Sequence, residues 1–314
     1  WFKGKEMALA MGLQLALARM GTATALILVP RIVNLDLDYI PFSETSKPAA
    51  VAMILMAVAV VVWSIFLFMD SKLDKQTAEE ARKNKETIEK EDKFRFSDIF
   101  KVLSDKHFIL ISLLCVFFYC CIISFRRFAT TIIIPRFGIE DDIASIMVSL
   151  IPFFTMVFTP IFGLLIDKKG KASRFMIIGS LLVLVAHLII GFAPGKEFFG
   201  YVGLGILGIG YSLVPAAMWP TVPKIIKEKN LGTAYSLIYW IQNMGMLVVP
   251  IIVGKIFTRT SAAIADPSVA SLKSAVNAEY FFVGLAIIAI VVSIILGKSA
   301  DKNPHLRIDM PNKQ

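Results

Sequence analysis

The sequence predicts an all-α protein that crosses a membrane several times. Of its 314 residues, 56% are hydrophobic, and the mean hydropathy is +0.70. The apolar residues form unbroken blocks of about 20 residues, the length that a helix needs to cross a bilayer. These blocks do not alternate in the way that barrel strands do. A soluble domain could not cover so much apolar surface with polar groups, so lipid is the expected solvent.

Eight such helices are expected along the chain. In chain order the expected helices cover about 7–30, 48–69, 107–128, 144–166, 174–193, 199–221, 232–256 and 279–297, each near the roughly 20 residues of a membrane span.

The net charge of +9 is distributed unevenly between the two sides of the expected membrane. If Trp1 lies on the cytoplasmic side, the cytoplasmic segments hold the cations between Lys72 and Lys106, the turn at 168–174 and the C-terminal cations. The opposite segments hold few. Cytoplasmic loops of membrane proteins carry an excess of Lys and Arg. The excess of positive charge therefore reflects the orientation of the chain in the membrane, and no nucleic-acid partner is expected.

One long polar segment, residues 70–106, separates the second expected helix from the third. Its acidic and basic residues alternate, as at Glu79, Arg82, Lys83 and Glu86. Such charges, three or four residues apart, suit a solvated helix. We interpret the segment as a cytoplasmic linker.

The three cysteines, Cys115, Cys120 and Cys121, all fall within the third expected helix. Disulfide frameworks and zinc sites need ligands at defined spacings with partners elsewhere. The sequence shows no such partners, so the cysteines are interpreted as core thiols. No metal and no cofactor are expected.

A short basic turn joins the fourth and fifth expected helices. It reads Gly163-Leu-Leu-Ile-Asp167-Lys168-Lys169-Gly170-Lys171-Ala-Ser-Arg174. The pattern resembles the G-x-x-x-D-[K/R]-x-G-[K/R]-[K/R] loop of major facilitator superfamily transporters. The resemblance implies a gate, in which Asp167 caps a neighbouring helix terminus or pairs with an Arg in one state of the carrier. A plain basic turn is the alternative.

A second set of motifs is more specific. It comprises Ala217-Met-Trp219-Pro220, Leu231-Gly232-Thr233-Ala234-Tyr235, Ile241-Gln242-Asn243-Met244-Gly245 and Leu15-Ala-Leu-Ala18-Arg19-Met-Gly21. These motifs resemble the branch of the superfamily that contains a lysosomal dipeptide uniporter. The resemblance covers nearly the whole chain. By its register, the eight spans are helices 5–12 of an expected twelve, and the chain is truncated at its N-terminal side.

The resemblance implies four regions. They are the last two helices of an N-terminal bundle (1–69), the charged linker (70–106), a C-terminal six-helix bundle (107–297) and a cytoplasmic tail (298–314). The chain departs from the branch at Arg126-Arg127, which lies where the branch is apolar. The helices expected to carry an acidic partner for a substrate amine also fall outside the matched register.

Arg19 lies near the middle of the first expected helix, too deep to reach the membrane surface easily. A charge at that depth is costly unless it faces a wet cavity or a partner. A guanidinium can hold a carboxylate with two parallel hydrogen bonds, which suits capture of a peptide C-terminus. A structural ion pair with another helix is the alternative.

Four further residues are candidates for substrate binding. Trp219 is interpreted either as an anchor at the membrane surface or, through the resemblance, as part of the cavity wall. Gln242 and Asn243 can hydrogen-bond to a peptide backbone or join helices to each other. Tyr239 lies one helical turn from Asn243 and is expected to share its face.

His187 is interpreted as a packing residue, because the sequence shows no nearby acid or metal partner. No Asp or Glu is expected in the interior of any span, whereas proton-coupled carriers usually need one. Uncoupled transport is therefore favoured.

A G-x-G-x-x-G pattern occurs in the sixth expected helix, at Gly203, Gly205, Gly208 and Gly210. No strand precedes it, so the pattern predicts close helix packing rather than a dinucleotide site.

The resemblance implies a carrier with rocker-switch alternating access, and facilitated uniport of dipeptides is the favoured hypothesis. A carrier of another small organic anion and a proton-coupled symporter are the alternatives. A membrane enzyme is disfavoured, because the spans show no paired acids and no activated nucleophile. A channel or receptor is disfavoured by the gate-type loop.

The expected partners are a small-molecule substrate and the lipid bilayer, with an accessory membrane subunit if the protein is lysosomal. The bacterial inner membrane is the favoured location, and the lysosomal membrane is the alternative.

Overall fold

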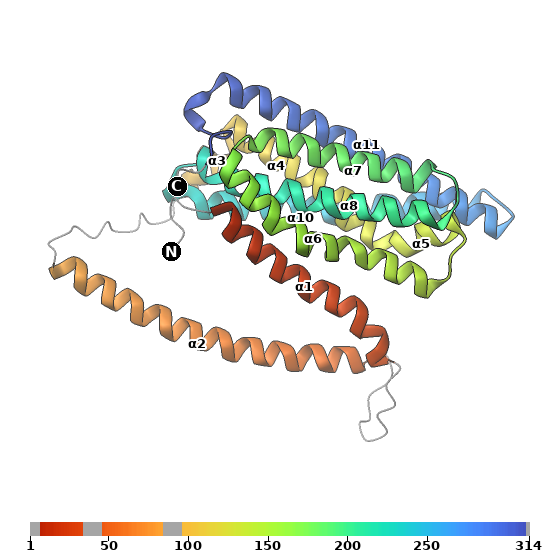
Figure 1. Cartoon of the computed structure of the whole chain (residues 1–314), viewed down its shortest axis with the longest axis horizontal. Coiled ribbons are helices and arrows are strands. Elements are labelled where there is room, and N and C mark those ends of the chain that lie inside the picture. Colours follow the sequence, from red (N-terminus) through yellow and green to blue (C-terminus); the bar gives the residue numbers. More distant parts are fainter. Residues whose placement is uncertain (1–6, 34–45, 84–95, 312–314) are drawn as a thin grey trace. The chain divides into compact units, whose positions relative to one another are not determined.

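The computed structural model describes residues 7–33, 46–83 and 96–311, and every regular element in these ranges is helical (Figure 1). The prediction of an all-α membrane protein is confirmed. The chain divides into two compact units, residues 1–24 with 95–314 and residues 25–94.

The helices of the described residues follow in chain order. They are α1 (Met7–Val33), α2 (Lys47–Lys83), α3 (Phe96–Leu103), α4 (Lys106–Tyr119), η1 (Cys120–Ser124), α5 (Phe125–Phe137), α6 (Asp141–Lys169), α7 (Ala172–Phe192), α8 (Glu197–Met218), η2 (Trp219–Thr221), α9 (Val222–Ile225), η3 (Glu228–Asn230), α10 (Leu231–Ala262), α11 (Pro267–Lys302) and η4 (Pro304–Leu306).

Seven helical stretches in the described residues are long and apolar enough to cross a membrane. They correspond to seven of the eight expected spans and extend beyond most of the expected ends. The first expected span lies on α1, which is helical but is not among the seven. Of the expected linker, α2 continues to Lys83 and α3 begins at Phe96, and residues 84–95 lie outside the described part.

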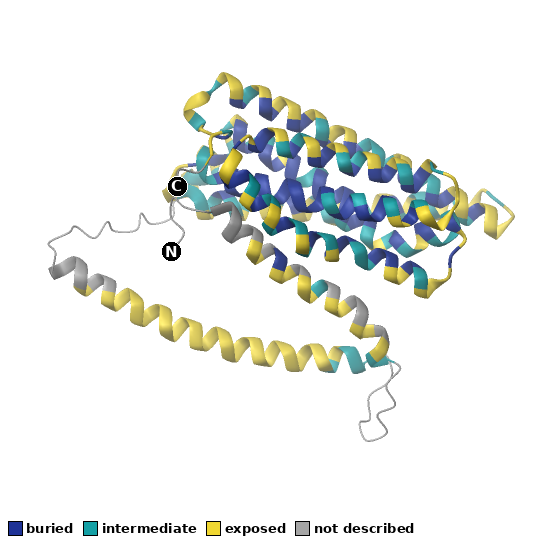
Figure 2. Cartoon of the chain, in the orientation of Figure 1, coloured by how far each residue is buried: buried dark blue, intermediate teal, exposed yellow. Residues whose placement is uncertain are grey.

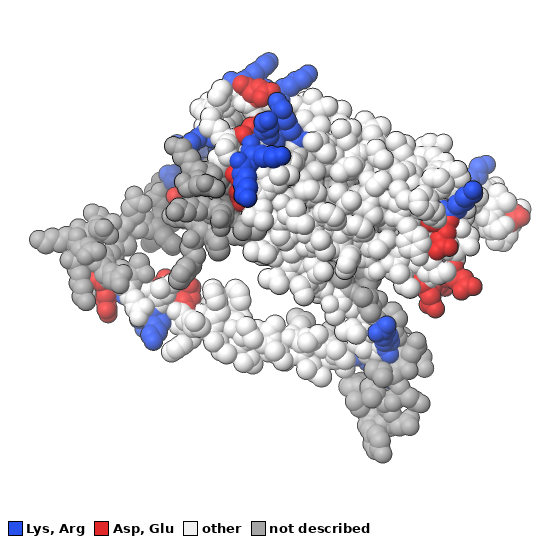
Figure 3. Space-filling view, in the orientation of Figure 1, with Lys and Arg blue, Asp and Glu red and all other residues white. Residues whose placement is uncertain are grey.

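Six of the seven stretches form one bundle, from α4 to α11. In it, α8 packs against α6 and α7, and α11 packs against α4, α5, α7 and α10. Buried residues line the interior of this bundle, whereas the apolar span of α2 is exposed along its length (Figure 2). On the face shown in Figure 3, charged side chains gather toward the two ends of the bundle and leave an uncharged surface between them. This pattern fits a lipid-facing belt.

The predicted close packing at the glycines of α8 agrees with the structure. A Cβ on Gly203 would lie 2.7 Å from Ile190 Cγ1 of α7, and one on Gly208 would lie 2.8 Å from Phe154 Cβ of α6. A Cβ on Gly210 would lie 3.0 Å from the backbone carbonyl oxygen of Gly179 in α7. Small residues thus let α8 sit between its two neighbours.

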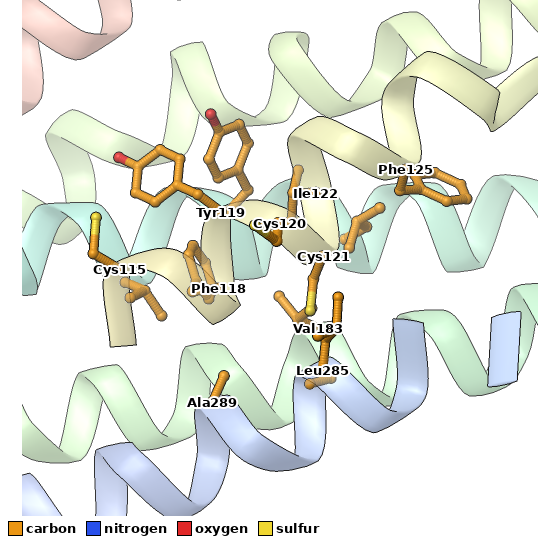
Figure 4. Close-up of a cluster of buried hydrophobic side chains, with 14 of the residues drawn as sticks. Cys115, Phe118, Tyr119, Cys120, Cys121, Ile122, Phe125, Val183, Leu285 and Ala289 are labelled. Carbon is orange, nitrogen blue, oxygen red and sulfur yellow. The ribbon is translucent and has the colours of Figure 1, made fainter. Parts of the chain in front are cut away.

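The third expected span is interrupted in its middle by η1, a π-helical turn. Figure 4 shows this turn within a cluster of buried side chains, with Cys121 pointing toward Val183 and Leu285. All three cysteines are buried free thiols, as predicted. A π-helical turn inside a long helix commonly marks a functional position.

α11 begins well before the expected start of the last span. Asp266 Oδ1 accepts hydrogen bonds from the N–H groups of Ser268 (2.8 Å) and Val269 (3.3 Å), and Pro267 occupies the first turn. These bonds and one from the Ser268 hydroxyl lower the pKa of the Asp266 carboxyl. Because the helix starts here, Glu279 lies about three turns inside it, at 3.6 residues per turn. The expectation that no acid lies inside a span is wrong for this residue.

Candidate functional site

Aromatic side chains from α4, α8, η2 and α10 meet in the bundle. The indole of Trp219 stacks on Tyr239 of α10 at 4.9 Å between ring centroids and lies 5.9 Å from Tyr235. Its Nε1–H donates to the hydroxyl of Tyr119 at 3.0 Å, and Tyr119 meets Tyr211 of α8 edge to face. We call these five residues the aromatic cluster.

The environment of Trp219 differs from that of an anchor at the membrane surface. The residue is only 5% exposed, and the Tyr235 hydroxyl donates to its carbonyl oxygen at 3.2 Å. Tyr239, by contrast, is 50% exposed. The aromatic cluster therefore runs from the core to an exposed face of α10.

The two neighbouring amides of α10 have different surroundings. Gln242 is buried, and its Oε1 accepts a hydrogen bond from the Cys115 thiol at 3.3 Å, which joins α10 to α4. Asn243 is exposed, and its Nδ2 donates to the Tyr239 carbonyl oxygen at 2.7 Å. Tyr239 and Asn243 thus share one exposed face, as the helical spacing predicts.

Among the arginines singled out in the sequence, Arg19 lies in the middle of α1, and its side chain is outside the described part. Arg126 and Arg127 directly follow the π-helical turn at the start of α5. Arg126 is partly buried and Arg127 is exposed.

The turn between α6 and α7 has the tight geometry that its sequence predicts. Gly170 has a φ of +65° and Lys171 has a φ of +58°, both in the left-handed region that favours glycine. Lys168, Lys171 and Arg174 are exposed, whereas Gly163 and Asp167 are buried.

The C-terminal segment binds directly to this turn. Asp309 accepts hydrogen bonds from the N–H and the hydroxyl of Ser173 in the first turn of α7, the former at 2.7 Å. The Asp309 carbonyl oxygen accepts from the Lys171 N–H at 2.8 Å. A Cβ on Gly170 would lie 2.4 Å from that carbonyl oxygen, so only glycine leaves room for the segment.

Lys224 of α9 completes this contact. Its Nζ donates to the carbonyl oxygens of Met310 (3.0 Å) and Ile308 (3.4 Å) and interacts electrostatically with Asp167 and Asp309. Ile308 is 2% exposed. We call residues 307–311 the tail segment. Its Asp309, which the sequence did not single out, caps the helix whose terminus adjoins the predicted gate.

At the other end of the bundle, two ionisable side chains meet in a closed interior. His187 Nδ1 of α7 lies 2.8 Å from Glu279 Oε2 of α11, and both side chains are fully buried. The expectation that His187 has no nearby acid is therefore wrong. The longer α11 is the reason, since it carries Glu279 into the bundle.

The comparisons with known proteins agree with this architecture. The sequence profile of the Major Facilitator Superfamily matches residues 1–250 and, in an overlapping second match, residues 114–308. The chain belongs to the major facilitator superfamily. This match confirms the family that the turn at Gly163–Arg174 resembles, a transporter family of multi-pass membrane proteins.

Within this superfamily, the chain is similar to lysosomal dipeptide transporter MFSD1. It is 29% identical over 259 residues to the Bos taurus protein and 28% identical over 260 residues to the Homo sapiens protein, in each case over 82% of this chain and 53% of the relative. The Danio rerio protein is 27% identical over 303 residues, 94% of this chain and 60% of the relative. The chain spans about half the length of the curated relatives it matches.

Sequence reasoning missed Tyr119, Glu279 and Asp309. A polar-tipped aromatic in an otherwise apolar span was a signal for Tyr119, and the Asp266-Pro267 cap was a signal for the early start of α11. Nothing local marked Asp309, because its hydrogen-bond partners Lys171 and Ser173 lie more than a hundred residues away along the chain.

Proposed function

We propose that this protein carries dipeptides across a membrane by alternating access, as a facilitated uniporter. The observation that carries the proposal is the similarity over 82% of the chain to proteins named lysosomal dipeptide transporters. The same relatives support a lysosomal membrane as the location. They give no support to the bacterial inner membrane that the sequence reading favoured.

The aromatic cluster supports a role in binding a small organic solute. Tyr239 and Asn243 present a ring and an amide on one exposed face of α10, and Trp219 backs this face from the core. An amide side chain can donate to and accept from a peptide bond. Aromatic rings supply apolar contact for variable side chains at low conformational cost.

Arg19 is the proposed partner of the substrate carboxylate. A residue in the middle of a span is at the depth where carriers of this kind place their sites. Its planar guanidinium can bind a carboxylate with two parallel hydrogen bonds. A carrier of another small organic anion would use the same group, and an accessory membrane subunit is proposed only for the lysosomal case.

The test is uptake of labelled dipeptides into proteoliposomes that contain the intact protein. Arg19→Lys should retain part of the uptake and Arg19→Ala almost none, since Lys keeps the charge and loses the planar fork. The matched control is Arg31→Ala, an exposed arginine in the last turn of the same helix. This control should transport like the wild type.

Dipeptides amidated at the C-terminus sharpen the test. Losing a charge-assisted hydrogen bond of about 1.5–3 kcal/mol should weaken their competition roughly ten- to hundredfold. They should lose nothing further against Arg19→Ala. Equal competition by free and amidated dipeptides would contradict the role of Arg19, and selective uptake of other organic anions would contradict the peptide substrate.

Proton-coupled symport is the second candidate function. The observation that favours it is the buried pair of His187 and Glu279. The sequence favours uncoupled transport because it predicts no acid inside a span, and Glu279 removes that reason. A proton flux that accompanies substrate uptake at a fixed stoichiometry would replace uniport by symport.

A further inference from the structure

The three buried side-chain N and O atoms that lack a hydrogen-bond partner in the described part of the chain belong to Ser124, His187 and Glu279. They are Ser124 Oγ, His187 Nε2 and Glu279 Oε1. Buried polar groups are normally satisfied by protein or water, so each such atom requires an explanation. Two of the three belong to the same ion-pairing contact, which points to a ligand at that place.

The surroundings of the pair are aromatic. The imidazole of His187 stacks on Phe282 of α11 at 5.3 Å between centroids and meets Phe125 of α5 edge to face, also at 5.3 Å. A Cβ on Gly191 would lie 2.7 Å from Glu279 Cβ, so α7 leaves no room for water along that side. Phe125 directly follows the π-helical turn that contains Ser124. The closed pair therefore depends on how α5 packs against α7 and α11.

Few charged groups act on the pair. Arg136 of α5 interacts electrostatically with Glu279, and Cys121 of η1 lies near the same carboxyl. Arg136 donates its hydrogen bonds to the carbonyl oxygens of Ile190 (3.0 Å, from Nε) and Ala193 at the end of α7. Within the described residues, Arg136 forms no ion pair with Glu279, and α8 and α10 contribute no ionisable group that acts on this carboxyl.

We propose that His187 and Glu279 form a proton-binding site, which takes up one proton when the bundle closes around them. Separated and in water at neutral pH, the two groups carry a net charge of −1, since an ordinary His titrates near about 6.5 and a Glu near about 4.3. An uncompensated charge is disfavoured in a closed aromatic interior. One added proton makes the pair neutral, either as imidazolium with carboxylate or as imidazole with carboxylic acid.

The sign of the pH dependence follows from the proton count. Above about pH 6.5 the closed pair holds one proton more than the separated groups. Each further pH unit therefore shifts the equilibrium about tenfold toward the open bundle, in which His187 and Glu279 are separated. Between about pH 4.3 and 6.5 both states hold the same number of protons, so the equilibrium is flat. Below that range the separated groups hold one proton more, and acid favours opening.

The first test determines the protonation state of the intact protein without any substrate. Infrared difference spectroscopy detects a carboxylic acid, and nitrogen NMR of labelled histidine detects an imidazolium. At about pH 8, which is above the ordinary pKa of histidine, either the carboxylic-acid signal or the imidazolium signal should be present. Glu279→Gln should abolish it. Neutral imidazole together with ionised carboxylate at this pH would overturn the proposal.

The second test measures the pH dependence of the unfolding equilibrium for the wild type and for Glu279→Gln, which keeps the shape but cannot ionise. The unfolding constant of the wild type, divided by that of Glu279→Gln, should rise about tenfold per pH unit above about pH 6.5. Matched controls are Glu140→Gln and His305→Gln, which alter exposed residues and should leave the slope unchanged. A flat ratio would overturn the proposal. Neither test depends on dipeptide transport.

Discussion

At the scale of single residues, Trp219 has the most informative surroundings. Its indole both stacks on Tyr239 and donates to the Tyr119 hydroxyl, so it links α10 to α4 across the end of α8. A buried Trp with its N–H satisfied contributes packing area and orientation together. This arrangement explains why a Trp-Pro pair at this position forms part of the core.

Replacing Trp219 with Phe should keep the stacking and remove the hydrogen bond to Tyr119. The expected loss of unfolding free energy exceeds the roughly 0.5–1.5 kcal/mol of one hydrogen bond, because the smaller ring also leaves a cavity at this buried position. Tyr119→Phe should cost less, and the double variant should cost less than the sum of the two, because both changes remove the same bond. Thermal unfolding in detergent measures all three. Full additivity would contradict the coupling, and the exposed Trp240→Phe is the control.

At the scale of elements, the tail segment makes the first turn of α7 dependent on the C-terminus. The N-terminal N–H groups of a helix need acceptors, and Asp309 supplies them from outside the helix. Asp167, the acid that the sequence reading placed in the gate, lies next to Lys224, which also holds the tail segment. The gating role of Asp167 stays a prediction.

Asp309→Ala should release the tail segment from α7. The N–H groups of Lys171 and Ser173 would then lose their acceptors, and their hydrogen exchange should accelerate. The loss of a capping acid is typically worth about 0.5–2 kcal/mol. Gly170→Ala should give the same result by collision with the Asp309 carbonyl. Asp301→Ala, an exposed acid of α11, is the control, and unchanged exchange in both test variants would contradict the contact.

At the scale of the whole molecule, the number of spans determines which segments share a side of the membrane. Six spans lie between the end of α2 and the end of α11. An even number returns the chain to the side from which it started, and the Lys-rich composition of both segments favours the cytoplasm.

Cysteines introduced at Ser71 and Lys302 should therefore both resist a membrane-impermeant thiol reagent, whereas one at Lys196 should react. All three positions are exposed. The nearby Ser299 is less suitable for cysteine replacement than Lys302, because its hydroxyl hydrogen-bonds with His107 Nε2 at 2.9 Å. The native cysteines are buried and should give little background. Reaction at Ser71 without reaction at Lys302 would contradict the topology.

The sequence by itself determined the fold class, seven of the eight expected spans and the family. Each of these depends on local properties, namely the length of apolar blocks and motifs such as the turn at Gly163–Arg174. The pairing of Tyr239 with Asn243 on one face also followed from helical spacing. Only the tertiary structure decided which polar groups meet. Glu279 reaches His187, and Asp309 reaches Ser173, through contacts between segments separated by 92 and 136 residues. Helical periodicity relates only residues a few turns apart, so such contacts depend on how the helices pack.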